Sequence, residues 1–321
     1  MLDTLQQGQK RLSNEAKTRI VSFTNSQLAE NGGFMDKNRK ADLYYTPFGL
    51  MLAYILKPDI NTHPTEQWLY KQKKQLSDLV YLSAFIRSRL LCRLLKTGKT
   101  GYAINRLLKT GKTGYVINRL LKTRQTLPVF AGYPHDDMYS PYSQFLFLSL
   151  QEDLGIDATA NQQELLTSLS AYRIENRGYS NIRGGLLAST NATVAALAIK
   201  GQLCGYPVND NSCRDNETIH YLYSSQDESG GFFAGVSSPV PDLLSTATAL
   251  FMMRCYGITP RFVADDFIEA HWLPSGGFGA TLMDETGDVE YTFYGLLALG
   301  AAIQGNGNRI FVETTKTDNI K

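Results

Sequence analysis

Long apolar runs that begin directly after an acidic or hydroxyl residue recur along the chain. Three of them start at Ser189 ("STNATVAALAI"), Asp242 ("DLLSTATALFMM") and Asp288 ("DVEYTFYGLLAL"). A run that is apolar on nearly every side predicts a buried helix, and Asp or Ser at its start is a typical N-cap. The segments before these runs, such as "QQELLTSLSAYRI" and "ADDFIEAHW", are apolar on one face only and predict outer helices.

A glycine-aromatic turn stands at a fixed distance before each of these runs. In every case the helix start follows eleven residues after the glycine that precedes the aromatic residue, and the starts are 46 to 53 residues apart. Glycine permits positive φ in a tight turn, so the turn suits a connection between an outer and an inner helix. This spacing indicates a repeated two-helix unit. The turns are Gly178-Tyr179, Gly231-Phe232 and Gly277-Phe278.

Two looser copies of the same unit lie upstream. One starts at Asp42 ("DLYYTPFGLMLAYIL") and the other at Asp136 ("DDMYSPYSQFLFLSL"), and each follows a glycine-aromatic pair. With 321 residues and 43% hydrophobic content, the chain can bury one large core. We therefore predict one all-α domain over residues 1–321.

Composition and charge exclude some classes of partner and location. The formal net charge is +2, so the molecule as a whole does not favour nucleic acid. The polar start of the chain does not resemble a signal peptide, which predicts a cytoplasmic protein. The four cysteines show no C-x-x-C pair and are expected to be buried thiols rather than metal ligands or a disulfide framework.

The repeated turns, above all "SSQDESGGFFAG" and "PSGGFGA", resemble those of a known superfamily. It includes squalene and oxidosqualene cyclases, class II diterpene cyclases and the β-subunits of protein prenyltransferases. The resemblance covers about residues 20 to 303. It implies an α/α toroid of about five to six helix pairs, in which inner helices surround a central apolar cavity and outer helices surround the inner ones.

One branch of this superfamily, the prenyltransferase β-subunits, uses zinc held by an Asp-x-Cys pair and by a histidine in a D-x-Y-H-T-like helix start. Here Asp288 begins the matching stretch "DVEYT", and Tyr291 stands where that histidine belongs. Neither Cys204 nor Cys213 has an aspartate two residues before it. We therefore expect no metal and no other cofactor.

The class II cyclases instead use an Asp-x-Asp-Asp-Thr-Ala-like helix start, whose middle acid protonates an alkene or epoxide. Superposed on this motif, "DVEYTF" places Asp288 first and Glu290 at the middle acid, so the resemblance implies that Glu290 is the proton donor. Asp136 and Asp137 in "YPHDDMYSPY" are the competing acids. An apolar cavity and a neighbouring carboxylate both raise the pKa of a carboxyl, as an alkene-protonating acid requires.

Aromatic residues gather at the starts of the inner helices, where their faces can stabilise a carbocation. An arginine near the cavity mouth would suit a carboxylate or diphosphate head group. The residues expected to bind substrate are Tyr44, Tyr45, Tyr139, Tyr142, Tyr291, Phe293, Tyr294, Arg177 and Arg183.

A basic tandem repeat interrupts the toroid pattern at residues 93–124. "RLLKTGKTGYAIN" recurs almost unchanged after thirteen residues, and the stretch holds nine Lys and Arg residues and no acid. Its "GKT" is not a phosphate-binding loop, because the glycine needed upstream is an arginine. We interpret the stretch as a surface insertion that could also contact an anionic membrane.

These features favour a class II terpene cyclase, an intramolecular isomerase that converts a linear polyprenyl or prenylated-aromatic substrate. We expect its partner to be a small isoprenoid, with no nucleic acid and no obligate protein partner. A prenyltransferase β-subunit-like protein and a non-catalytic toroid that binds a lipid or peptide remain as alternatives.

Overall fold

The computed structural model describes residues 1–58, 60–72, 76, 78–97, 139–153, 162–175, 177–205 and 216–302. Within these ranges the chain forms twelve helices. Asp136, Asp137 and the predicted insertion from residue 98 onward lie outside the described residues.

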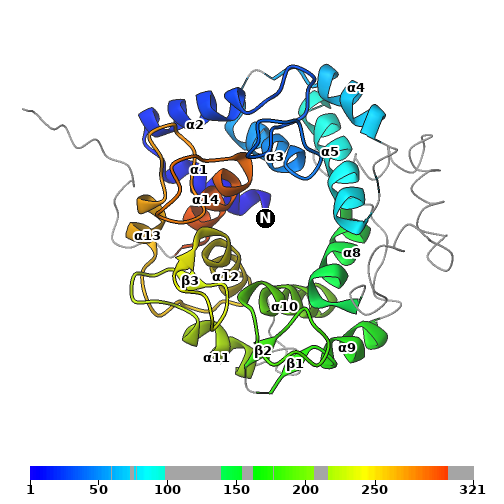
Figure 1. Cartoon of the computed structure of the whole chain (residues 1–321), viewed down its shortest axis with the longest axis vertical. Coiled ribbons are helices and arrows are strands. Elements are labelled where there is room, and N and C mark those ends of the chain that lie inside the picture. The colour runs from blue at the N-terminus through cyan, green and yellow to red at the C-terminus, as the bar shows by residue number, and fades with distance from the viewer. Residues whose placement is uncertain are drawn as a thin grey trace, which may run out of the picture.

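Six helices form a closed ring, and each packs on the next around it (Figure 1). They are α3 (Thr46–Leu56), α5 (Leu79–Thr97), α8 (Pro141–Asp153), α10 (Thr190–Cys204), α12 (Leu243–Cys255) and α14 (Val289–Ala301). Five helices lie outside this ring: α2 (Asn14–Ser26), α4 (His63–Gln72), α9 (Gln162–Ser170), α11 (Asn216–Ser224) and α13 (Asp265–Ala270). The all-α toroid is confirmed.

One inner helix, α5, belongs to a pair that the sequence repeats did not reveal. Asp78 precedes α5 as Asp242 and Asp288 precede their helices, and its Oδ1 accepts a hydrogen bond from the backbone N–H of Tyr81 at 2.8 Å. No glycine-aromatic turn precedes this helix, and Leu82 stands where other copies have threonine. Helices α4 and α5 therefore complete a toroid of six inner helices.

The repeated threonine ties each turn to its inner helix. Thr292 Oγ1 accepts a hydrogen bond from the backbone N–H of Phe278 at 3.2 Å and donates one to the carbonyl of Asp288 at 2.6 Å. The same acceptor role recurs at Thr46, Thr193 and Thr246. Phe278 is fully buried, so its N–H needs this acceptor. The shared register of threonine and glycine-aromatic pair thus has a direct physical cause.

Short strands stabilise the turns within single units, at the end of the ring where inner helices begin. β1 (Arg173–Ile174) pairs with β2 (Gly178–Tyr179), and β3 (Phe232–Phe233) pairs with β4 (Pro241–Asp242), both antiparallel. Successive units are also linked directly, since the Thr190 N–H donates to the Ala234 carbonyl at 2.9 Å. These links fix the inner helix starts relative to one another.

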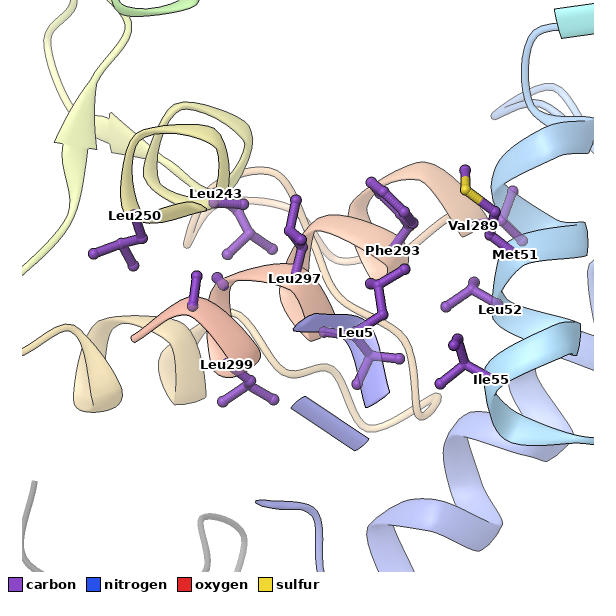
Figure 2. Close-up of a cluster of buried hydrophobic side chains, with 14 of the residues drawn as sticks. Leu5, Met51, Leu52, Ile55, Leu243, Leu250, Val289, Phe293, Leu297 and Leu299 are labelled. Carbon is purple, nitrogen blue, oxygen red and sulfur yellow. The ribbon is translucent and has the colours of Figure 1, made fainter. Parts of the chain in front are cut away.

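Helix α1 (Leu2–Arg11) joins the N-terminal part of the chain to its last inner helix. Gly8 and Gly300 allow α1 and α14 to touch, because a Cβ at Gly300 would lie 1.8 Å from the Thr4 carbonyl oxygen. Buried Arg11 donates to the Leu299 carbonyl at 2.8 Å and pairs with Asp265 at 2.7 Å. Figure 2 shows the apolar side chains that α1, α3, α12 and α14 contribute to the core beside this contact.

Two sequence expectations change in detail. The first five residues of the predicted insertion, 93–97, belong to α5 and bury Leu94. Cys204 is disulfide-bonded rather than a free thiol, whereas Cys92 and Cys255 are free. Sequence spacing carried no sign of this bond, because it depends on proximity in space. None of the helices in the described ranges is long and apolar enough to span a bilayer.

Candidate functional site

The starts of α3 and α14 meet where the ring closes, and there they bring two polar side chains together. Glu290 lies two residues after the cap Asp288, and Tyr44 lies two residues after Asp42 in the turn that leads into α3. The Tyr44 hydroxyl donates a hydrogen bond to Glu290 Oε1 at 2.6 Å. Tyr44 and Glu290 therefore occupy equivalent positions in neighbouring units, and their side chains face each other.

Glu290 is the most strongly perturbed carboxyl at this seam. It is 7% exposed. Its pKa is raised from 4.5 to about 7, chiefly by burial and also by the nearby Asp288 carboxylate, while the Tyr44 hydroxyl and the Lys37 ammonium act in the opposite direction. A carboxyl with this pKa holds its proton near neutral pH and can act as an acid.

Asp288 is mainly a structural cap. It is 2% exposed, and its Oδ1 accepts a hydrogen bond from the Tyr291 N–H at 2.8 Å. Its Oδ2 has no hydrogen-bond partner among the described residues, although the Lys37 Nζ lies 3.9 Å away. Burial raises the pKa of Asp288, and the Tyr291 N–H and the Lys37 ammonium oppose this effect.

Lys37 covers the outer side of this pair of acids. Its side chain is 51% exposed, and its Nζ lies 5.0 Å from the centre of the Tyr291 ring. The ammonium thus lies between an aromatic face and a buried carboxylate, both of which attract a cation.

Aromatic rings form a cluster near Glu290. Phe48 lies at the centre of this cluster, 5.4 Å from the Tyr44 ring, 5.2 Å from Phe293 and 5.9 Å from Tyr294. Sequence analysis missed Phe48, although it lies six residues after Asp42 just as Tyr294 lies six residues after Asp288. That shared register could have found it.

Most of the predicted aromatic residues do gather here. The ring of Tyr45 lies edge-on to Tyr44 at 5.5 Å, and Tyr291 lies 6.3 Å from Tyr294. Tyr142 comes from α8 and is close enough to raise the pKa values of Tyr44 and Tyr294. Tyr139, by contrast, is 54% exposed at the edge of the described residues.

The two predicted arginines are not part of this cluster. Arg177 is exposed and lines a separate cavity of about 510 Å³ with Leu186, Leu187 and Val236. Arg183 is also exposed. Neither has a contact with Glu290 or Asp288 in the structure, so the expected anion anchor is not brought to the acids.

A second cavity, of about 340 Å³, adjoins Tyr44 between the starts of α3 and α5. Its walls combine tyrosine rings with carboxylates, and Lys37 lies at its edge. The lining residues are Asp36, Lys37, Asn38, Asp42, Tyr44, Tyr45, Asp78, Val80 and Tyr81. The Asp42, Asp78 and Asp36 carboxylates all raise the pKa of Tyr81, with Asp42 having the largest effect. The predicted apolar cavity at the centre of the toroid stays a prediction.

The zinc site of the prenyltransferase branch does not fit these residues. Tyr291 occupies the histidine position, and a lysine ammonium lies over its ring. Asp288 uses one carboxylate oxygen to cap α14. Across the described part of the chain, no three His, Cys, Asp or Glu side chains gather as metal ligands.

The fold agrees with a comparison to protein families. Residues 1–81 and 188–315 match the prenyltransferase alpha-alpha toroid domain. These ranges make up more than half of the chain and include Tyr44, Asp288 and Glu290. The protein therefore belongs to the prenyltransferase alpha-alpha toroid domain family. No curated protein matches the sequence.

Proposed function

We propose that this toroid is a class II terpenoid cyclase whose proton donor is Glu290. The observation that carries the proposal is a carboxyl that is 7% exposed, has a pKa of about 7 and is surrounded by aromatic rings. An acid that protonates an alkene must be neutral before the reaction and protected from water. Glu290 meets the first requirement near neutral pH.

The proposed reaction begins when the Glu290 O–H bond breaks and a C–H bond forms at the terminal alkene of a linear isoprenoid. The alkene π electrons make that bond and leave a tertiary carbocation at the adjacent carbon. The next alkene attacks this cation and closes a ring, and loss of a proton ends the sequence. Phe48, Phe293 and Tyr294 present rings that can stabilise the cation by roughly 0.5 to 2 kcal/mol each.

Glu290 is a better donor than Asp288 for a structural reason. Asp288 holds the start of α14 through its Oδ1, so removal of that side chain would also cost a helix cap. Glu290 caps no helix. Asp136 and Asp137 lie outside the described residues and remain competing acids from the sequence alone.

The test is incubation of metal-stripped protein with linear polyprenyl diphosphates and prenylated aromatic acids, followed by mass spectrometry and NMR. A cyclase gives a product of unchanged mass with fewer alkene signals, and in deuterium oxide the product carries a deuteron at the initiating carbon. Glu290→Gln should abolish the product, whereas Glu285→Gln, which changes an exposed acid in the same turn, should not.

Two results would redirect the proposal. Turnover that survives in Glu290→Gln would transfer the role of donor to Asp288 or to the acids at 136 and 137. Recovery of every substrate unchanged by the wild-type protein would favour a non-catalytic binding toroid, or a prenyltransferase-like protein that needs a partner.

A further inference from the structure

The hydrogen bond between Tyr44 and Glu290 links two inner helices that are distant in sequence. The donor and acceptor residues are 246 positions apart, and the distance of 2.6 Å is short for a hydroxyl-carboxyl pair. Among the described residues, a hydrogen bond reaches the carboxyl at Oε1. The two oxygens of Glu290 are therefore not equivalent.

Tyr44 is itself held in place in the turn that leads into α3. The Asp42 carboxylate accepts a hydrogen bond from the Tyr44 backbone N–H at 2.7 Å. The Tyr44 ring meets Tyr45 and Phe48 edge-on, at 5.5 Å and 5.4 Å between ring centres. A ring fixed on both sides keeps its hydroxyl aimed in one direction, as a positioning group must.

We propose that Tyr44 is a positioning residue that holds Glu290 by Oε1, so that Oε2 carries the proton that is donated. The inference rests on the proposed function of Glu290. In the neutral acid, Oε1 is the carbonyl oxygen and accepts from the phenol, which leaves the Oε2 hydroxyl free to face substrate. Tyr44 therefore acts through Glu290 and not as a wall of the substrate site.

The same hydrogen bond makes Glu290 a stronger acid. As the Oε2–H bond breaks, negative charge spreads over both oxygens, and the bond from the phenol to Oε1 strengthens. Burial raises the pKa of Tyr44 far above its ordinary value, so the phenol keeps its proton and remains a donor. The hydrogen bond thus opposes the effect of burial on the pKa of Glu290.

Other charged and titratable groups also act on Glu290 and must be held constant in a test. Asp288 on the same helix raises its pKa, and Lys37 from the turn before α3 lowers it. Tyr294 and, from α8, Tyr142 are close enough to interact electrostatically with Tyr44. None of these residues changes in a Tyr44→Phe variant, which removes a single oxygen atom.

The decisive measurement is the titration of the Glu290 carboxyl by infrared difference spectroscopy, with Glu290→Gln as the reference that lacks the signal. In Tyr44→Phe the pKa of Glu290 should rise by about one to two units, because a hydrogen bond to the charged form is lost. Tyr45→Phe is the matched control, since Tyr45 touches Tyr44 but donates no hydrogen bond to Glu290. In this control the titration should be unchanged.

Turnover provides a second measurement. Tyr44→Phe should lower kcat by about tenfold or more with little change in KM, because the lost interaction strengthens in the transition state. An unchanged Glu290 titration in Tyr44→Phe, or an equal shift in Tyr45→Phe, would overturn the proposal. Since the titration needs no substrate, absence of any cyclised product would refute the proposed function while the titration still tests the role of Tyr44.

Discussion

The pKa of Glu290 makes the stability of the fold depend on pH in a direction that can be measured. Its value of about 7 in the folded protein exceeds the ordinary 4.5. Folding therefore favours the protonated carboxyl, and the unfolded chain loses that proton more readily. The stabilisation is complete below pH 4.5 and is lost as the pH rises to about 7.

The magnitude follows from the size of the shift. Each pKa unit corresponds to about 1.4 kcal/mol, so ionisation of Glu290 costs the folded state up to roughly 3 kcal/mol. Glu290→Gln removes the ionisation but keeps an oxygen that can accept from Tyr44. Its free energy of unfolding should equal that of the wild type in acid and exceed it by up to about 3 kcal/mol well above pH 7.

Urea unfolding followed by tryptophan fluorescence at a series of pH values measures this difference. Trp68 lies next to the turn at Gly33 and Trp272 next to the turn at Phe278, so they report on the two units whose inner helices, α3 and α14, form the site. Glu285→Gln is the control, because its exposed side chain should give a curve parallel to the wild type. If Glu290→Gln also runs parallel to the wild type, Glu290 has no raised pKa and the reasoning about the acid is wrong.

Three further predictions concern the packing that supports the site. Gly300→Ala should lower the free energy of unfolding by about 1–3 kcal/mol in a urea titration, because its Cβ would meet the Thr4 carbonyl at 1.8 Å and force α1 from α14. Thr292→Val should cost about 1–3 kcal/mol by leaving the buried Phe278 N–H without its acceptor, and exposed Thr18→Val should cost much less. His271 is 1% exposed and burial lowers its pKa, so its contribution to stability is present above pH 6.5 and lost on acidification. Thermal melts of His271→Gln should show less acid destabilisation than those of the wild type.

The sequence predicted five of the six inner helices because one local rule repeats. An N-cap, a threonine four residues later and a glycine-aromatic turn must share a register, since the threonine hydroxyl bonds the turn and the cap residue's carbonyl together. The repeat pattern did not predict helix α5, because Leu82 cannot make these bonds and no glycine-aromatic turn precedes the helix. Its place in the ring follows from packing with α3 and α8, which no local pattern encodes.

The sequence named several residues that the structure brings together, but it did not show which of them contact each other. The sequence named Glu290, Asp288 and most of the nearby rings, but it gave no sign of the hydrogen bond from Tyr44 to Glu290. That Tyr44 binds substrate stays a prediction. Contacts between residues so far apart in sequence depend on how the ring closes. The position of Arg177 could not be predicted for the same reason. It was expected near the substrate, but its turn lies beside α10 and α11 and it lines another cavity.

The repeat itself explains why one acid stands out from the others. Asp78, Asp242 and Asp288 stand at the starts of inner helices, and Asp42 accepts similar bonds in the turn before α3, so an acid at that register position has a structural reason to be there. The position two residues later has no such role. It holds tyrosine before α3, valine in α5, asparagine in α10 and leucine in α12, and an acid in α14.

An acid at a position that other units fill without charge is costly, since burial penalises its ionised form. The ring places Glu290 beside the one neighbouring unit that offers a phenol at the matching position. A residue that adds nothing to the repeat, raises the cost of folding at neutral pH and has a dedicated hydrogen-bond donor is better explained by chemistry than by structure. This argument favours an acid-catalysed function for Glu290 over a merely architectural one.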